Sequence, residues 1–581
     1  MILVFGGTTE GRKAVEVLEE AGNAYFYSTK TGEQDITLHH GIRLDGALDA
    51  EAMQSFCREH NIRLIVDAAH PFASQLHQTI AQVSELLNVP VIRYERIYLP
   101  RDPDITWIDD YSQIPTNIHS LLATTGVQSI SKLKYLEAEG IKVAYRILNR
   151  ESSIALAHQQ GATDDQLCFY PQMAEAEAIL MKESGESGGF SEKVAEAKER
   201  GMRIIALKRP KSTQRIATRH SQRENRPYCV NGPHGLRRAV ENLLPEFYPL
   251  HSGLTTGTCA TAAAVAETLR LLKGETPAEV PVILSNSETI MVAVGYGDGF
   301  AFCIKEAGDD PDVTNGLKIR AKVEPSDCFE IVGGEGVGRF TLPGFDYSPG
   351  EAAINKGPRE MMHQNIKENV RITISVPDGE VIARRTFNPR LGIEGGISII
   401  GVSGIVKPFS EEAFIDSIRK CMTVAKASGA ERVVINSGGK SERYVKALYP
   451  NLPQQAFVEY GNYIGETLKI AHELDIRNVT LGVMLGKAVK LAVGHLDTHS
   501  RKTTMDKAFI RQMLEESGCD LDISSIILAR ELWKMIPADK VKTFANTIIN
   551  HCAAHCTPLL PNGSLVILLI DDDGNIYRHS N

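Results

Sequence analysis

A histidine stands just past a short apolar run, at a place where chemistry is expected. The run Leu-Ile-Val-Asp, residues 64–67, predicts a buried strand, and Ala-Ala-His-Pro follows it. Because Pro71 restricts the residue before it to extended backbone, His70 should stand at the carboxyl edge of a parallel sheet, where doubly wound folds bind ligands. We predict His70 as a catalytic proton donor or anchor and Asp67 as a substrate contact. A histidine that only makes a loop hydrogen bond is the alternative.

A glycine-rich turn near the start of the chain could hold a nucleotide. It contains Gly6, Gly7, Thr8 and Gly11. The turn lies between the strand-like Met1–Phe5 and a helical segment, so backbone N–H groups and a helix N-terminus can approach a pyrophosphate. We predict these four residues as cofactor-binding. The spacing G-G-x-x-x-G departs from the dinucleotide fingerprint G-x-G-x-x-G, so a purely structural tight turn is the alternative.

A second such turn contains Ser184 and Gly185, which we also predict as cofactor-binding. Gly188-Gly189 and a helix with Lys193 follow, so the turn is either an anion cradle or a plain loop. Residues 28–30, after the second predicted strand, are Ser-Thr-Lys and offer no acidic side chain to favour an unphosphorylated ribose. The choice between NADH and NADPH therefore stays open.

Carboxylates crowd into the segment Gly-Asp-Asp-Pro-Asp-Val-Thr-Asn-Gly, residues 308–316. Carboxylates packed together should raise at least one pKa, which suits a general base. We predict Asp310 and Asp312 as candidate catalytic bases. The spacing is not that of a calcium loop, and a solvated acidic turn is the alternative.

Ser437-Gly438-Gly439 follows a further strand-like run, residues 431–436. Gly439-Lys440-Ser441 resembles the end of a phosphate-binding loop, but Val434 stands where its first glycine would be, which argues against phosphoryl transfer. We predict Gly438 and Gly439 as cofactor-binding residues of a βα turn.

Two histidines and two cysteines at helical spacing could ligate a metal: His551, Cys552, His555 and Cys556. Buried helix residues and incidental thiols explain this pattern better. We therefore predict no metal site.

The elements that must position these residues alternate through the first half. Strand-like and helical segments follow one another, which predicts parallel doubly wound sheets. After Ser252 the pattern changes to α+β, with a hairpin expected between 288–294 and 301–305, and alternates again after Ala413. The predicted fold is α/β, with two Rossmann-like parallel-sheet lobes, followed by an α+β domain of two subdomains. We divide the chain into 1–104, 105–249 with a basic loop at 208–226, 250–412 and 413–581.

The composition of the chain limits the classes of partner that we expect it to bind. The chain has 581 residues and a net charge of −9, from 63 Lys plus Arg and 72 Asp plus Glu, so a polyelectrolyte nucleic-acid binder is not expected. The apolar run 565–570 has a strand's length and not a membrane span's. The ten cysteines are scattered, which favours reduced thiols in a cytoplasm. We expect no membrane association and leave open whether the chain forms a homo-oligomer.

Motifs of the first half occur together in order, in segments 6–12, 67–73, 124–126 and 182–189. They resemble the precorrin-6A reductase family of cobalamin biosynthesis, over about residues 1–210. The resemblance implies a reduced nicotinamide and a tetrapyrrole in the cleft between two Rossmann-like lobes, with hydride transfer to the macrocycle.

Motifs of the second half occupy segments 253–266, 308–316, 336–344, 350–359, 387–406 and 486–500. They resemble the cobalt-precorrin-5B C1-methyltransferase family of the anaerobic route, from residue 252 to about residue 581. This resemblance implies S-adenosylmethionine as the methyl donor and a fold outside the usual tetrapyrrole methylase class.

The two resemblances together imply a bifunctional enzyme. C1 methylation of cobalt-precorrin-5B gives cobalt-precorrin-6A, which a reductase takes to 6B with NADH or NADPH. Because these substrates carry many carboxylates, local cationic pockets must bind them. We predict Arg146 and Arg390 as substrate contacts, Glu394 as the residue that fixes the loop backbone beside the substrate, and His499 as a further contact. The alternative is a generic NAD(P)H oxidoreductase fused to a tetrapyrrole-binding or scaffold module.

Overall fold

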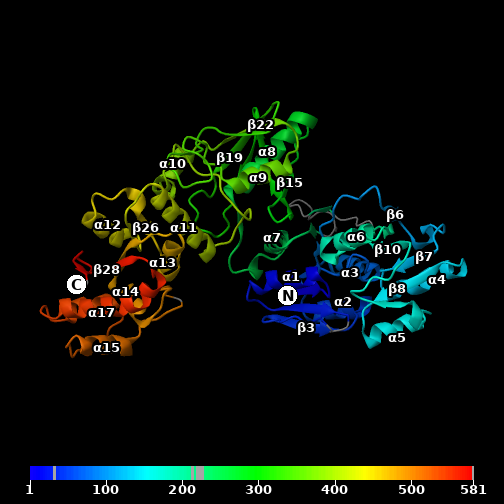
Figure 1. Ribbon diagram of the computed structural model, residues 1–581, viewed down its shortest axis with the longest axis horizontal. Coiled ribbons are helices and arrows are strands. Elements are labelled where there is room, and N and C mark those ends of the chain that lie inside the picture. Colours follow the sequence, from blue (N-terminus) through cyan, green and yellow to red (C-terminus); the bar gives the residue numbers. More distant parts are fainter. Residues whose placement is uncertain (31–33, 211–214, 217–227, 501, 579–581) are drawn as a thin grey trace. The chain divides into compact units, whose positions relative to one another are not determined.

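The computed structural model describes residues 1–30, 34–210, 215–216, 228–500 and 502–578 (Figure 1). Most of the basic loop expected at 208–226 lies outside these residues. The chain divides into two compact units. The first unit comprises Met1–Ser252, Pro277–Ala293 and Ser403–Ile405, and the second comprises the remainder.

The first sheet of the first unit is parallel throughout, in the order β12-β13-β5-β4-β1-β2-β3. Its strands are β1 (Ile2–Phe5), β2 (Tyr25–Thr29), β3 (Gly41–Asp45), β4 (Leu64–Asp67), β5 (Val91–Tyr94), β12 (Arg215–Ile216) and β13 (Tyr228–Val230). Apolar side chains alternate between its two faces. One face packs on α1 (Thr9–Glu19) and α7 (Pro233–Leu243), and the other on α2 (Ala50–Glu59) and α3 (Ser74–Leu87).

The second sheet is also parallel, in the order β6-β11-β10-β7-β8-β9. Its strands are β6 (Thr106–Ile108), β7 (Ser120–Ala123), β8 (Lys142–Ile147), β9 (Leu167–Phe169), β10 (Ala178–Lys182) and β11 (Arg203–Leu207). Helices α4 (Ile130–Ala138) and α5 (Glu151–Gln159) cover one face, and α6 (Phe190–Glu199) covers the other. The two expected Rossmann-like lobes are confirmed.

The chain then returns to the first lobe. β13 pairs with β5, and α7 covers the same face of that sheet as α1. A division at residue 104 therefore does not separate the two sheets, because the edge of β5 is completed by a strand more than a hundred residues later in the chain.

A hairpin of β15 (Glu279–Ile283) and β16 (Thr289–Ala293) also belongs to the first unit. Its buried Glu288 accepts hydrogen bonds from the His234 and Gly235 amides at the N-terminus of α7. Those amides have no partner inside the helix, so a carboxylate there is stabilising. The hairpin expected between 288–294 and 301–305 is wrong, since β16 pairs with the strand before it in the chain.

The second unit begins with an α+β part. A mixed sheet in the order β17-β18-β19-β22-β20 packs on the buried helix α8 (Thr256–Lys273). The remaining elements of this part of the chain are β14 (Gly253–Leu254), β17 (Gly295–Gly297), β18 (Phe300–Ile304), β19 (Lys318–Pro325), β20 (Glu330–Gly333), β21 (Arg339–Phe340), α9 (Lys356–Asn365), β22 (Val370–Ser375), α10 (Gly379–Ala383), β23 (Ile393–Glu394) and β24 (Ile405–Val406).

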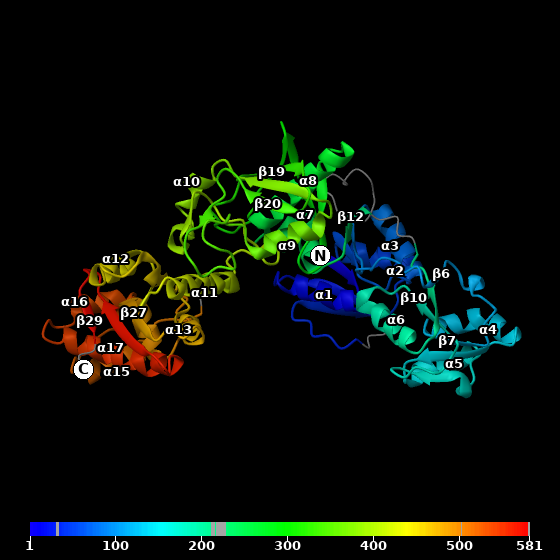
Figure 2. The same ribbon diagram turned by 45° about the horizontal axis from the view of Figure 1, so that its top comes forward.

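The rest of the second unit is an αβ part with the sheet order β26-β25-β27-β28-β29, in which only β29 is antiparallel. Its strands are β25 (Val433–Asn436), β26 (Phe457–Glu459), β27 (Asn478–Met484), β28 (Ser564–Ile570) and β29 (Ile576–Arg578). Its helices are α11 (Glu411–Ala427), α12 (Gly439–Leu448), α13 (Ile464–Glu473), α14 (Leu485–Val493), α15 (Lys507–Glu516), α16 (Leu532–Met535) and α17 (Val541–Cys556). Figures 1 and 2 show α12 on one side of the sheet and α13 and α17 on the other.

None of the described helices combines the length and the apolar character needed to cross a bilayer.

Candidate functional site

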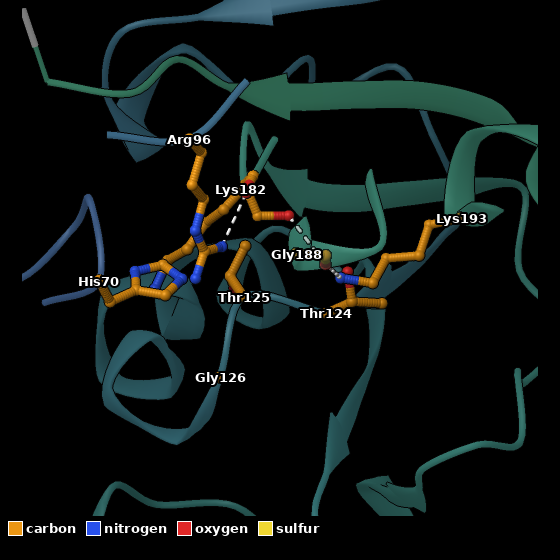
Figure 3. A pocket seen from close by; sticks show the side chains of 9 residues that line it. His70, Arg96, Thr124, Thr125, Gly126, Lys182, Gly188 and Lys193 are labelled. Carbon is orange, nitrogen blue, oxygen red and sulfur yellow. Dashed lines mark hydrogen bonds between the residues drawn. The ribbon is translucent and has the colours of Figure 1, made fainter. Parts of the chain in front are cut away.

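A cavity of about 450 Å³ lies between the two lobes of the first unit (Figure 3). Its lining residues are His70, Arg96, Thr124, Thr125, Gly126, Lys182, Ser184, Gly188 and Lys193. Three of them carry cationic side chains and none is acidic, so the cavity suits an anionic ligand. Figure 3 shows His70, Arg96 and Lys182 close together, with Lys193 beside Gly188.

Sheet topology explains why these residues meet. In the first sheet, strands are added outward in one direction from β1 and in the opposite direction from β4, so the strand order reverses between β1 and β4. In the second sheet the strand order reverses between β7 and β10. Loops that leave such switch points diverge and open a crevice at the carboxyl ends of the strands. The residues after β4, β7 and β10 all contribute to the cavity, which therefore joins the switch points of both sheets.

Arg96 ties the two lobes together. Its Nε donates to Glu10 Oε2 at 2.9 Å, and its Nη1 donates to the Ser184 carbonyl at 2.7 Å. Both side chains of the ion pair are 5% exposed. Burial by itself raises the pKa of Glu10, but the hydrogen bond from Ser187 and the charge of Arg96 outweigh it and leave that pKa lowered. Glu10 therefore stays ionised as the counterion of Arg96.

Two glycines let the second lobe approach Arg96. Gly185 has φ +70°, and a Cβ there would lie 2.9 Å from Arg96 Cβ. A Cβ on Gly188 would lie 2.6 Å from Arg96 Nη1 and 2.5 Å from Ser184 Cβ. The predicted turn at Ser184 and Gly185 thus reaches the cavity, and its small residues make room for a guanidinium.

Asp67 does not line the cavity but holds the loop that does. Its Oδ1 accepts from Arg93 Nη1 at 2.9 Å, and its Oδ2 is 2.7 Å from His77 Nδ1. The other ring nitrogen of His77 is 3.0 Å from the His70 carbonyl, and Arg93 also donates to the Ala69 carbonyl. These three side chains therefore fix the backbone around His70. The role of Asp67 as a substrate contact stays a prediction.

His70 enters the cavity as a neutral side chain. Its Nδ1 accepts a hydrogen bond from the Phe72 amide at 3.2 Å. Burial, with Arg96 and Lys182 adding to it, lowers the pKa of His70 to about 4. At neutral pH the imidazole therefore carries its one proton on Nε2, and this group can donate a hydrogen bond more readily than a proton.

The cavity lysines differ in their contacts. Lys193 Nζ donates to the Gly188 carbonyl at 3.2 Å. Lys182, at the end of β10, lies 5.3 Å from the centre of the Phe72 ring and makes no hydrogen bond or ion pair within the described residues. Sequence reasoning did not select Lys182 as a site residue; its position directly before the Ser184 turn was the available signal.

The first glycine turn lies at the neighbouring end of β1. Thr8 caps α1 by accepting from the Gly11 amide at 3.0 Å, and its hydroxyl donates to the Ala68 carbonyl. Tyr27 fills the space beside Gly6, whereas a Cβ on Gly7 would meet nothing within 4 Å. The turn therefore leaves open space over Gly7, next to a helix N-terminus.

Arg146 is the residue before the last of β8 and is buried. Its guanidinium lies 5.7 Å from the Tyr170 ring and makes no hydrogen bond within the described residues. Its pKa is lowered because burial penalises the charge, and its charge adds to burial in lowering the pKa of Lys193. A cation without a counterion beside Lys193 is what a carboxylate-binding residue requires, and the assignment stays a prediction.

In the second unit, the two candidate bases have different partners. Asp312 Oδ2 accepts from the buried Lys305 Nζ at 2.7 Å, and its Oδ1 accepts from the Thr314 hydroxyl and amide. Burial raises the pKa of Asp312, but Lys305 and Thr314 outweigh it and leave the pKa lowered. Asp310 Oδ1 accepts from the Phe409 amide at 3.0 Å. Their roles as bases stay predictions.

The predicted turn of the αβ part lies at the switch point between β25 and β27. Gly438 has φ +79°, and a Cβ there would lie 2.5 Å from Glu459 Oε1. A Cβ on Gly439 would meet nothing within 4 Å. Glu459 ends β26 beside β25, in register with Asn436, and its carboxylate accepts no hydrogen bond within the described residues. Sequence reasoning missed Glu459, although it follows Gly439 by about the 20 residues typical of a ribose-binding acidic residue.

Arg390 reaches the same sheet edge. Its Nη2 donates to Glu442 Oε2 at 2.8 Å, and its Nη1 lies 3.6 Å from Glu459 Oε2. That Nη1 is buried and makes no hydrogen bond within the described residues. Burial raises the pKa of Glu459 against the lowering effect of Arg390. Arg390 is therefore largely neutralised inside the protein, and its pairing with a substrate carboxylate stays a prediction.

A second cavity, of about 400 Å³, opens at the carboxyl ends of β27 and β28. Its lining is mostly apolar: Met484, Leu485, Gly486, Leu528, Ala529, Arg530, Trp533, Ile570 and Asp572. The cavity contacts the N-terminal residues of α14, whose first amides have no side-chain cap. An apolar wall with a few polar groups is typical of a small-molecule site.

The remaining predicted residues lie apart from these cavities. Glu394 is exposed in β23, and its side chain makes no hydrogen bond within the described residues. The His499 amide donates to Asp497 Oδ1. Cys552 and Cys556 are buried in α17, and His551 pairs with Glu516. Among the described residues, no three His, Cys, Asp or Glu side chains are grouped so that they could hold a metal ion.

Two family models match different parts of the chain. Residues 1–224 match precorrin-6x reductase CbiJ/CobK, and residues 245–408 match CbiD. The cobalt-precorrin-5B C(1)-methyltransferase of Prosthecochloris aestuarii is 40% identical over 352 residues, which cover 56% of this chain and 95% of that protein. The chain belongs to the cobalt-precorrin-5B C1-methyltransferase family. Its N-terminal part adds a domain of the reductase family, so both resemblances are confirmed.

Two solved structures are similar to parts of the chain. The cobalamin biosynthesis protein cbiD of Archaeoglobus fulgidus has 29% identity and a TM-score of 0.26, covering 44% of this chain and 84% of its own. CobK precorrin-6A reductase has 15% identity and a TM-score of 0.32, covering 42% and 96%. From the family matches, the chain is a bifunctional enzyme of cobalamin biosynthesis. We call its first unit the reductase unit and its second the methyltransferase unit.

Proposed function

We propose that the methyltransferase unit transfers a methyl group from S-adenosylmethionine to C1 of cobalt-precorrin-5B. The reductase unit then reduces the resulting cobalt-precorrin-6A to 6B with NADH or NADPH. The observation that carries the second half of this proposal is the cavity at which the switch points of two parallel sheets meet, lined by three cations and no carboxylate.

The residues of the reductase cavity fit both of its proposed ligands. A tetrapyrrole with many carboxylates needs cations that are not already neutralised, and Lys182, Lys193 and the nearby Arg146 supply them. A nicotinamide dinucleotide needs space beside a helix N-terminus, which the turn at Gly7 offers. The reduced nicotinamide, when bound, supplies the hydride. The chain's own residues hold the macrocycle and keep water away from the reacting atoms.

The sheet edge of the methyltransferase unit fits a nucleoside. Gly439 leaves space at the N-terminus of α12, and the Glu459 carboxylate beside it accepts no hydrogen bond within the described residues, so it could accept from a pair of ribose hydroxyls. S-adenosylmethionine, when bound, supplies the methyl group. Asp310 and Asp312 remain our candidate bases for the proton lost from the substrate.

The test supplies the full chain, without oxygen, with cobalt-precorrin-5B, S-adenosylmethionine and either nicotinamide. Mass spectrometry should show the gain of one methyl group and then of two hydrogens, with nicotinamide oxidised in step. Omitting the nicotinamide should stop the reaction at the methylated product. Absence of methyl gain would refute the methyltransferase assignment, and methyl gain without reduction would refute that of the reductase unit.

A further inference from the structure

Reduction of the macrocycle needs an acid as well as a hydride. A hydride is a hydrogen nucleus with two electrons, and it forms a bond to one atom of a conjugated double bond. The π-electron pair of that bond then moves to the atom at its other end. The new negative charge must be met by a proton from a group close to the ring. This step rests on the proposed function of the reductase unit.

The groups that line the cavity differ in their ability to give up a proton. Arg96 is held by Glu10 and by the Ser184 carbonyl, and a guanidinium does not deprotonate in a protein. His70 is neutral at physiological pH, and its Nδ1 is already an acceptor for the Phe72 amide. Neither side chain is therefore a suitable acid.

The two lysines remain, and their surroundings separate them. Lys193 Nζ donates one of its N–H groups to the Gly188 carbonyl. Lys182 Nζ has no hydrogen-bond or ion-pair partner within the described residues and lies over the Phe72 ring. The next residue, Glu183, does not neutralise it, because its carboxylate is bound by Arg101. Lys182 thus brings three N–H bonds to the cavity with nothing inside the protein to accept them.

We propose that Lys182 is the proton donor of the reduction. One N–H bond of its ammonium breaks, the proton bonds to the atom of the tetrapyrrole that received the electron pair, and the neutral amine regains a proton from solvent. The hydride and this proton together account for the two hydrogens gained, and the nicotinamide is oxidised.

The electrostatics of the cavity support this role. Burial lowers the pKa of Lys182, and Lys132 on α4 lowers it further. The charged groups around it, Arg96 after β5 and Lys193 on α6, are also cations. An ammonium with a reduced pKa is a stronger acid near neutral pH than an ordinary lysine, and its charge still attracts a carboxylated substrate.

The test separates proton donation from charge. Lys182→Arg keeps the positive charge but cannot donate a proton, and Lys182→Met removes both. We expect both variants to lose kcat by about 10²–10⁴-fold, the usual contribution of a general acid. With Lys182→Arg, the dissociation constants of the nicotinamide and of cobalt-precorrin-6A, measured by fluorescence quenching, should stay close to those of the wild type. Lys134→Met on α4 is the matched control and should keep wild-type kcat. Recovery of kcat in Lys182→Arg would overturn the proposal and leave Lys182 a charge anchor.

Two further readouts complete the test. Wild-type kcat should fall as the pH rises through the pKa of Lys182, because the acid must be protonated, and this fall should be absent in the residual activity of Lys182→Arg. In the ligand-free protein, amine acylation followed by mass spectrometry should give Lys182 a pKa below that of an ordinary lysine; an unshifted value would count against the proposal. Circular dichroism establishes that the variants fold. If the wild type itself oxidises no nicotinamide with cobalt-precorrin-6A, the proposed function fails, whereas a proton donor elsewhere leaves that oxidation intact.

Discussion

The reductase and methyltransferase units both gather polar residues at the carboxyl edges of parallel sheets, but the charged residues there differ in whether they form ion pairs. In the reductase cavity, Lys182 has no counterion within the described residues. At the methyltransferase sheet edge, Arg390 is already matched by Glu442 and Glu459, and the cavity nearby is mostly apolar. Under the proposed function, the same topology serves a polyanion at one edge and a nucleoside at the other. Charge pairing, more than strand order, would then set the class of ligand.

The largest expected effect concerns Arg96, a cation of the reductase cavity that has a counterion. Arg96→Met leaves Glu10 buried without its counterion and should destabilise the reductase unit by about 3–5 kcal/mol. Urea unfolding measures this, and reductase activity should fall with it. Arg63→Met removes an exposed ion pair with Glu246 and should cost only about 0–1 kcal/mol. Equal losses in the two variants would show that Arg96 does not lock the lobes.

A smaller loss of stability is expected in the methyltransferase unit. Asp312→Asn weakens the charged contact to the buried Lys305 and should cost about 1.5–3 kcal/mol at neutral pH. Because the pKa of Asp312 is lowered on folding, its contribution is complete above about pH 4 and fades as the pH falls through the folded value. The gap between wild type and variant should therefore narrow in acid. A gap that is constant with pH would argue against the ion pair.

The difference in ligand class can be probed at Glu459. Glu459→Gln should weaken binding of S-adenosylmethionine about tenfold or more, because the hydroxyls lose a charged acceptor. Isothermal titration measures the dissociation constant, and reductase kcat in the same protein serves as an internal control. Glu466→Gln, on the exposed side of α13, is the matched variant. Unchanged affinity in Glu459→Gln would place the donor elsewhere, with the apolar cavity as the next candidate.

The smallest effect concerns His70. Since its pKa lies at about 4, its charge should not change between about pH 6 and 8. The profile of reductase kcat/KM over that range should show no inflection at the usual histidine value, and His70→Asn should leave the shape of the profile unaltered. An inflection near pH 6.5 that disappears in His70→Asn would show that the histidine titrates after all.

Much of the fold followed from local pattern. Apolar runs predicted β1 and β4 to within a residue, because a strand buried on both faces must be apolar throughout. Turns at Gly6 and Gly438 were placed at sheet edges from their position between a strand and a helix. The local sequence pattern did not predict that β13 returns to the first sheet. Pairing between strands far apart in the chain depends on which edge strand of a sheet is free.

By itself, the sequence determined the family, the two catalytic halves and the positions of the candidate turns, since motif order and apolar periodicity are properties of the chain. Only the tertiary structure decided which charged groups form ion pairs within the protein and which face a ligand. Asp67 and Arg390 form ion pairs with residues on other elements, whereas Lys182 forms no ion pair within the described residues. Residues such as Arg96 and Ser184 are far apart in the chain and meet only when the two lobes pack. Because a charge is neutralised by what lies within a few ångströms of it, pairing of this kind is set by three-dimensional proximity.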